Sequence, residues 1–117
     1  MLNECVIMGR LVADPELRTT ATGKDVCTIR VAVERDYVPQ GKERETDFIT
    51  CVAWEKTGRF ISNYFYKGNM IAVAGSIQNR QYEDKDGNKR TATEILVRKA
   101  SFAGEKKEQS EDFVEVF

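Results

Sequence analysis

The sequence predicts an all-β barrel of five strands, with a single helix between the third and fourth strands. Apolar residues alternate at period two in several segments, which is typical of strands with one buried face. Glycine, proline and charged residues separate these segments, and the apolar spacing becomes helical only in residues 57–67. The last two strand-like segments flank a polar turn, which indicates a hairpin.

The first two strands are expected at residues 4–13 and 25–36, with a turn at 19–24 between them. Gly9 indicates a bend or bulge in the first strand. Pro15 ends that strand because proline has no backbone donor. In the second strand one row of side chains is apolar and predicted to be buried: Cys27, Ile29, Val31 and Val33.

The central strand is expected at residues 46–54, after a loop at 37–45. One face of this strand carries the small apolar residues Ile49, Cys51 and Ala53, which suit a core. The other face begins with an aromatic residue and ends with one, about 20 Å apart on an extended strand. That outward row is Phe48, Thr50, Val52 and Trp54.

The helix is expected at residues 57–67, with Thr57 as its N-cap and Gly68 as its C-terminal stop. Its apolar face has i, i+1, i+4 and i+5 spacing, which predicts burial. The residues on this face are Phe60, Ile61, Tyr64 and Phe65.

The last two strands are expected at residues 69–82 and 89–102, joined by a turn at Asp86-Gly87. Five strands in this order, with a helix after the third, match an OB-fold barrel. On the fourth strand the residues expected to be buried are Ile71, Val73 and Ile77.

The 117 residues divide into one domain, residues 1–103, and a short acidic tail, residues 104–117. The domain has 16 basic and 14 acidic residues, and the tail has 2 basic and 5 acidic residues. The tail lacks periodicity and is expected to be disordered. No apolar run approaches the roughly 18 residues of a membrane span or resembles a signal peptide, so a cytoplasmic protein is expected, without a membrane partner.

The three cysteines, Cys5, Cys27 and Cys51, lie in apolar strand segments, and the chain has no histidine. They are best interpreted as buried hydrophobic residues of a protein in a reducing compartment. Neither a metal site nor a catalytic dyad nor a cofactor loop is indicated. The carboxylates Glu43, Glu45 and Asp47 alternate with basic residues and suit a solvated face.

Aromatic side chains interleaved with cations predict binding of single-stranded nucleic acid, because bases stack on rings while cations follow the phosphates. The alternative for each ring is a place in the barrel wall or in a subunit interface. The stacking candidates are Tyr37, Phe48, Trp54 and Tyr82. The candidate phosphate-contacting cations are Arg10, Arg35, Lys42, Arg44, Lys56 and Arg80.

Several motifs together resemble the family of bacterial single-stranded DNA-binding proteins. They follow in order along residues 1–103 and occupy residues 2–18, 46–49, 52–56, 64–68, 80–82 and 93–97. The resemblance implies an OB-fold homotetramer that binds and protects single-stranded DNA, without cofactor or catalysis, in replication, recombination and repair. It also implies a nucleoid-associated protein and base stacking at the four aromatic positions named above.

The end of the tail resembles the acidic tip through which this family recruits partner proteins. Valine stands at position 116, where the family has proline, and Phe113 is an insertion into the acidic run. The alternative is a frayed, solubilising end. The candidate tip residues are Glu111, Asp112, Phe113, Val116 and Phe117.

Two other functions compete with single-stranded DNA binding. An OB-fold adaptor would use the same aromatic residues to contact proteins only. An RNA chaperone of the cold-shock type would use them to stack RNA bases.

Overall fold

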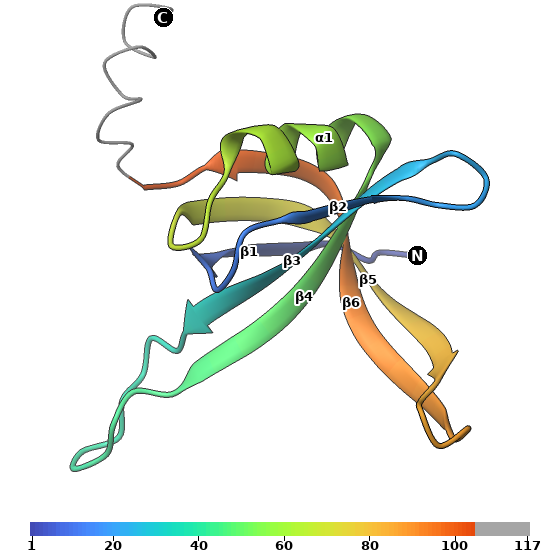
Figure 1. Cartoon of the computed structure of the whole chain (residues 1–117). Helices are drawn as coiled ribbons and strands as arrows, with labels where there is room; N and C mark the ends of the chain where they lie inside the picture. Colours follow the sequence, from blue (N-terminus) through green and yellow to red (C-terminus); the bar gives the residue numbers. More distant parts are fainter. Residues whose placement is uncertain (105–117) are drawn as a thin grey trace, which may run out of the picture.

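The structure, a computed structural model, describes residues 1–104 (Figure 1). It contains six strands and one helix in this part of the chain. Their bounds are β1 Cys5–Leu11, β2 Glu16–Thr19, β3 Asp25–Glu34, β4 Thr46–Trp54, α1 Glu55–Tyr64, β5 Met70–Glu83 and β6 Lys89–Phe102.

Five of the strands close into a barrel in the order β1-β5-β6-β4-β3, and β3 pairs back with β1. The OB-fold prediction of a five-stranded barrel, with the helix after the third barrel strand, is confirmed. Strand β2 was not predicted; it has four residues, and all of their side chains are exposed. It pairs with β3 through Glu16↔Thr28 to Thr19↔Asp25, beside the segment of β3 that pairs with β1.

Two hairpins extend beyond the barrel and diverge from each other (Figure 1). The parallel pairing of β4 with β6 covers only Cys51↔Ile95 and Val52↔Leu96, so the two hairpins separate on either side of this contact. We call residues 30–50 the β3–β4 arm and residues 77–94 the β5–β6 arm. The candidate site lies between these two arms.

The core lies inside the barrel and is apolar. The inward rows predicted for β3 and β4 are confirmed, with Val33 and Ile49 only partly buried. The predicted row of β5 is confirmed for Ile71 and Val73, but Ile77 is 48% exposed because it belongs to the diverging arm. The Asn3 side chain donates a hydrogen bond to the carbonyl oxygen of Ile77 and accepts one from its amide, each with a donor–acceptor distance of 2.9 Å.

Two glycines allow strands to approach closely. A Cβ at Gly9 would lie 2.3 Å from the carbonyl oxygen of Ala32, and one at Gly75 would lie 1.9 Å from that of Leu96. The predicted bulge at Gly9 is wrong, because Gly9 keeps regular register with Ile71. The register shift lies between Ala74 and Gly75.

Helix α1 covers the end of the barrel opposite the arms (Figure 1). It begins directly after Trp54, so the predicted N-cap at Thr57 is wrong. Glu55 makes this sharp strand-to-helix turn with a positive φ of 52°. The helix ends at Tyr64, and Gly68, with φ of 89°, belongs to the following turn rather than to the helix stop.

An aromatic cluster fixes the C-terminal end of α1 on the barrel. The rings of Phe65 and Phe102 are stacked, with 4.3 Å between their centroids, and the ring of Phe60 contacts both of them. Tyr64 contacts Phe60 at 5.4 Å but is 49% exposed, so it lies at the rim of the core rather than inside it as predicted. Within residues 1–104, no helix is long and apolar enough to cross a membrane.

Candidate nucleic-acid interface

The outward row of β4 lies beside the outward row of β3. Directly opposed residues of antiparallel strands share a face, so the register places Phe48 next to Ala32 and Trp54 next to Val26. Between these ends, Thr50 pairs with Arg30. Aromatic, polar and cationic side chains therefore alternate along one face that leads from the barrel onto the β3–β4 arm.

A groove of about 750 Å³ lies between this face and the β5–β6 arm. Trp54 lines it from the end of β4, and Tyr82 and Arg80 line it from β5. Residues with hydroxyl and amide groups also line it, among them Thr28 and Asn79. A groove lined by flat rings and polar residues suits an extended ligand with stacked and hydrogen-bonding parts.

All four aromatic residues predicted to stack are exposed. The exposed fraction is 77% for Tyr37, 53% for Phe48, 42% for Trp54 and 43% for Tyr82. Trp54 and Tyr82 line the groove together, and Phe48 shares the outward row of Trp54. Tyr37 lies in the loop between β3 and β4 and does not line the groove.

Each arm carries a guanidinium over an aromatic ring. Arg30 lies 5.4 Å from the ring centroid of Phe48, and Arg80 lies 5.4 Å from that of Tyr82. Such a cation–π contact orients the ring and leaves its other face open.

Three of the predicted phosphate-contacting cations, Arg35, Arg44 and Arg80, form ion pairs within the described residues. Arg35 forms ion pairs with Glu45 and, at 3.0 Å, with Asp47. Arg44 donates hydrogen bonds to the carbonyl oxygens of Arg35 and Asp36, just before Tyr37. Both arginines therefore hold the base of the loop that carries Tyr37.

The third is Arg80, which makes a two-pronged ion pair with Glu94, with N···O distances of 3.0 and 3.2 Å. Hydrogen bonding to Glu94 raises the pKa of Arg80 further above its ordinary value. In the same way, the hydrogen bond from Arg35 lowers the pKa of Asp47 below its ordinary value. The Arg80–Glu94 pair carries no net charge, whereas Arg35 together with Glu45 and Asp47 carries a net charge of −1.

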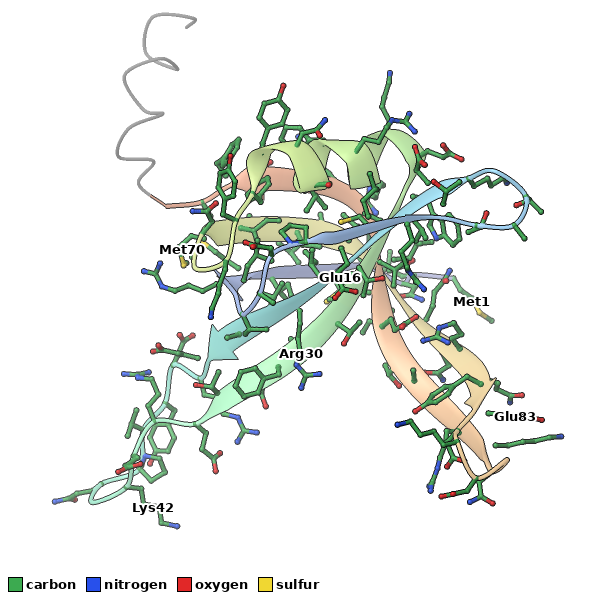
Figure 2. The ribbon with its side chains drawn as sticks, viewed as in Figure 1. Met1, Glu16, Arg30, Lys42, Met70 and Glu83 are labelled. Atoms are coloured by element: carbon green, nitrogen blue, oxygen red, sulfur yellow. The ribbon has the colours of Figure 1, made fainter. Side chains whose placement is uncertain are left out.

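The other three predicted cations are dispersed. Arg10 donates a 3.0 Å hydrogen bond to the carbonyl oxygen of Gly68, near the end of the barrel. Lys42 lies at the far tip of the β3–β4 arm (Figure 2), and Lys56 lies in the first turn of α1. The structure thus does not bring the six predicted cations together in one patch.

Sequence reasoning missed two cations on the site face. Arg18 of β2 lies opposite Val26 and lines the groove beside Trp54. Arg30 alternates with the buried row of β3 and is not among the six cations predicted from the sequence. Neither arginine forms an ion pair within residues 1–104. The outward alternation of β3 could have indicated Arg30, whereas the exposed strand β2 gave no periodic pattern from which Arg18 could be placed.

The cysteines lie away from this face. Cys27 and Cys51 are fully buried, and burial raises their thiol pKa to about 11 and about 12, respectively. Both are therefore protonated in the folded chain at neutral pH. Among the described residues, no group of three or more His, Cys, Asp or Glu side chains could hold a metal ion. The predicted tip residues Glu111 to Phe117 lie outside the described residues.

The closed barrel and its covering helix define an OB-fold protein. Two of its exposed rings line a groove, and a third lies farther along the same face. A sequence model of the Single-strand binding protein family matches residues 2–103, and the chain belongs to this family.

Named bacterial relatives agree with this assignment. Single-stranded DNA-binding protein 2 of Listeria monocytogenes is 43% identical over 102 residues, covering 87% of this chain and 64% of that protein. The single-stranded DNA-binding protein of Enterococcus faecalis is 44% identical over 96 residues, which cover 82% of this chain and 51% of that protein. The single-stranded DNA-binding protein of Caldanaerobacter subterraneus is 40% identical over 129 aligned positions, which cover 100% of this chain and 86% of that protein. The chain therefore spans between half and two thirds of the length of the first two relatives.

Proposed function

We propose that this chain binds and protects single-stranded DNA without catalysing a reaction and without preference for sequence. The observation that carries this proposal is the position of Trp54 and Tyr82 on one groove, with Phe48 farther along the same face. Relatives that cover most of the chain are named single-stranded DNA-binding proteins, which supports the choice of ligand.

In the proposed complex, unpaired bases stack on the exposed rings and the backbone passes the neighbouring cations. Stacking tolerates any base because each base has a flat face, and phosphate contacts depend on charge rather than sequence. Polar groove residues such as Thr28 and Asn79 hydrogen-bond to the strand. Binding of this kind needs no cofactor and moves no proton.

The fluorescence of Trp54 tests this proposal directly, because it is the only tryptophan in the chain. Stacking should quench its emission strongly when oligo(dT) is added. Unchanged emission, together with unchanged mobility of a labelled oligo(dT), would refute the proposed function and favour the protein-only adaptor. Competition with a matched RNA oligonucleotide separates the third candidate, since a chaperone of the cold-shock type would prefer the RNA.

Self-association, expected as a homotetramer, is also proposed. The exposed side chains of Leu2, Val6 and Met8 form an apolar strip on and before β1. In the described chain, β1 pairs with β3 only at Arg10 and Leu11, so one edge of β1 is open over its first residues. Light scattering should give the mass of an oligomer for the wild type and a smaller mass for Met8→Glu. A monomeric wild type would exclude the tetramer.

The protein is proposed to act in the cytoplasm, at the nucleoid. Its tail is proposed to recruit replication, recombination and repair proteins there. The rings of Phe113 and Phe117 beside acidic residues suit an apolar pocket with a basic rim on a partner. Binding of purified proteins of these three classes should weaken for Phe117→Ala. Equal binding by the full chain and by a chain lacking residues 111–117 would assign the tail no such role.

A further inference from the structure

The two arms beside the groove carry the same pair of groups, an arginine over an aromatic ring. Arg30 lies over Phe48 on the β3–β4 arm, and Arg80 lies over Tyr82 on the β5–β6 arm, at the same 5.4 Å from each ring centroid. The two pairs nevertheless differ in their net charge.

Arg80 is neutralised within the protein. Its guanidinium forms two hydrogen bonds with the carboxylate of Glu94, whose side chain is only 12% exposed. A phosphate that approached Arg80 would have to compete with this carboxylate and would be repelled by it. Arg80 is therefore suited to orient Tyr82 and poorly suited to hold a phosphate.

Arg30 has no such partner. It is exposed and forms no ion pair in the part of the chain that the structure describes. The carboxylate closest to it in the sheet register is that of Glu16, which lies opposite Thr28, one diagonal step away. The full positive charge of Arg30 is therefore available to a ligand.

The position of Arg30 suits a phosphate contact. It pairs with Thr50, which lies between Phe48 and Trp54 on the outward row of β4, next to Phe48. Figure 2 shows its side chain extending from the β3–β4 arm toward the space between the two arms. A strand whose bases stack on both Phe48 and Trp54 must carry its backbone past this guanidinium.

We propose that Arg30 makes a salt-dependent phosphate contact on this face, whereas Arg80 makes none and serves only to position Tyr82. The inference rests on the proposed function and divides the work of the site. The β3–β4 arm contributes both stacking and charge, and the β5–β6 arm contributes stacking alone.

The salt dependence of binding to a short oligo(dT) tests the inference. Each phosphate contact to single-stranded DNA contributes about 0.7 to the slope of log K against log salt. Arg30→Gln should make this slope shallower by about 0.7. Arg30→Lys should keep the wild-type slope because the positive charge remains. Lys67→Gln removes the same charge from the turn after α1, which belongs to neither arm, and should leave the slope unchanged.

The double variant Arg80→Gln/Glu94→Gln is the matched control on the other arm, because it removes the pair without changing net charge. It should weaken binding equally at every salt concentration and leave the slope at the wild-type value. A wild-type slope for Arg30→Gln, or a shallower slope for the double variant, would overturn the inference while the proposed function stands. If wild-type protein does not bind oligo(dT) at all, the proposed function fails and this inference fails with it.

Discussion

Phe48 and Trp54 mark the two ends of one outward row on β4, and neither ring is needed inside the barrel. Each is about half exposed, and the core contacts of β4 come from the alternate residues. Replacing both rings by alanine should therefore leave the fold intact. It should cost on the order of 2–6 kcal/mol of binding free energy, since each stacked base contributes about 1–3 kcal/mol.

Titration of labelled oligo(dT) by anisotropy measures this loss for Phe48→Ala/Trp54→Ala. Tyr66→Ala is a suitable control, because Tyr66 is 56% exposed and does not line the groove. Its affinity should remain at the wild-type value. Wild-type affinity in the double variant would show that this row is not the binding face.

At the scale of elements, the turn of the β5–β6 arm depends on the carboxylate of Asp84. The predicted turn at Asp86-Gly87 is confirmed, with Gly87 at φ of 81°. The carboxylate of Asp84 holds it by accepting 2.9 Å hydrogen bonds from the amides of Asp86 and Asn88 and from Arg90 Nε. This carboxylate fixes the end of the arm that carries Tyr82.

The charge of Asp84 makes the order of this arm depend on pH. The Arg90 hydrogen bond, followed by the backbone bonds, lowers the pKa of Asp84 below its ordinary value of 3.8. Because this pKa is lower in the folded state, the ionised carboxylate stabilises the arm fully above pH 3.8. The stabilisation is lost as pH falls through the pKa that Asp84 has in the folded state. The NMR signal of Arg90 Nε–H should therefore be sharp at pH 6 and broaden only at strongly acidic pH.

Asp84→Ala should reproduce the loosened arm at pH 6. Amide exchange should accelerate in residues 82–90, while the barrel strands keep their protection. Asp86→Ala is the control, because Asp86 contributes its backbone amide to the turn and should leave exchange nearly unchanged. Equal protection in Asp84→Ala and wild type would show that strand pairing alone holds the arm.

At the scale of the whole molecule, the sequence was informative wherever one barrel wall separates two environments. Alternation placed Cys51 and Ala53 inside and Phe48 and Trp54 outside, because a period of two maps directly onto the two faces of a strand. It failed for Ile77, since the arm that carries Ile77 leaves the barrel and has no buried face.

Pairing between distant charges could not be predicted. Arg35 and Asp47 are 12 residues apart, and Arg80 and Glu94 are 14 apart, so the strand register decides whether they meet. The same register brings Arg30 beside Phe48. Single-residue patterns therefore identified the exposed aromatic residues but could not separate free cations from neutralised ones.

The closed barrel also determines which thiols can react. Cys27 and Cys51 have no exposed surface, and burial raises their pKa to about 11 and about 12, so at pH 8 they present neither access nor thiolate. Cys5 is only partly buried. Iodoacetamide at pH 8 should therefore add at most one label to the native protein, at Cys5, and three labels in concentrated urea.

Mass spectrometry of labelled protein counts the adducts, and Cys5→Ser is the control that should remain unlabelled until it unfolds. In that variant the rate of labelling at Cys27 and Cys51 should follow the global opening of the barrel, because both thiols face the same core from adjacent strands. Binding of oligo(dT) should slow this labelling, since a ligand that binds only the folded state lowers the unfolded population. Rapid labelling of either residue in the native variant would show that the barrel opens locally between β3 and β4 rather than as one unit.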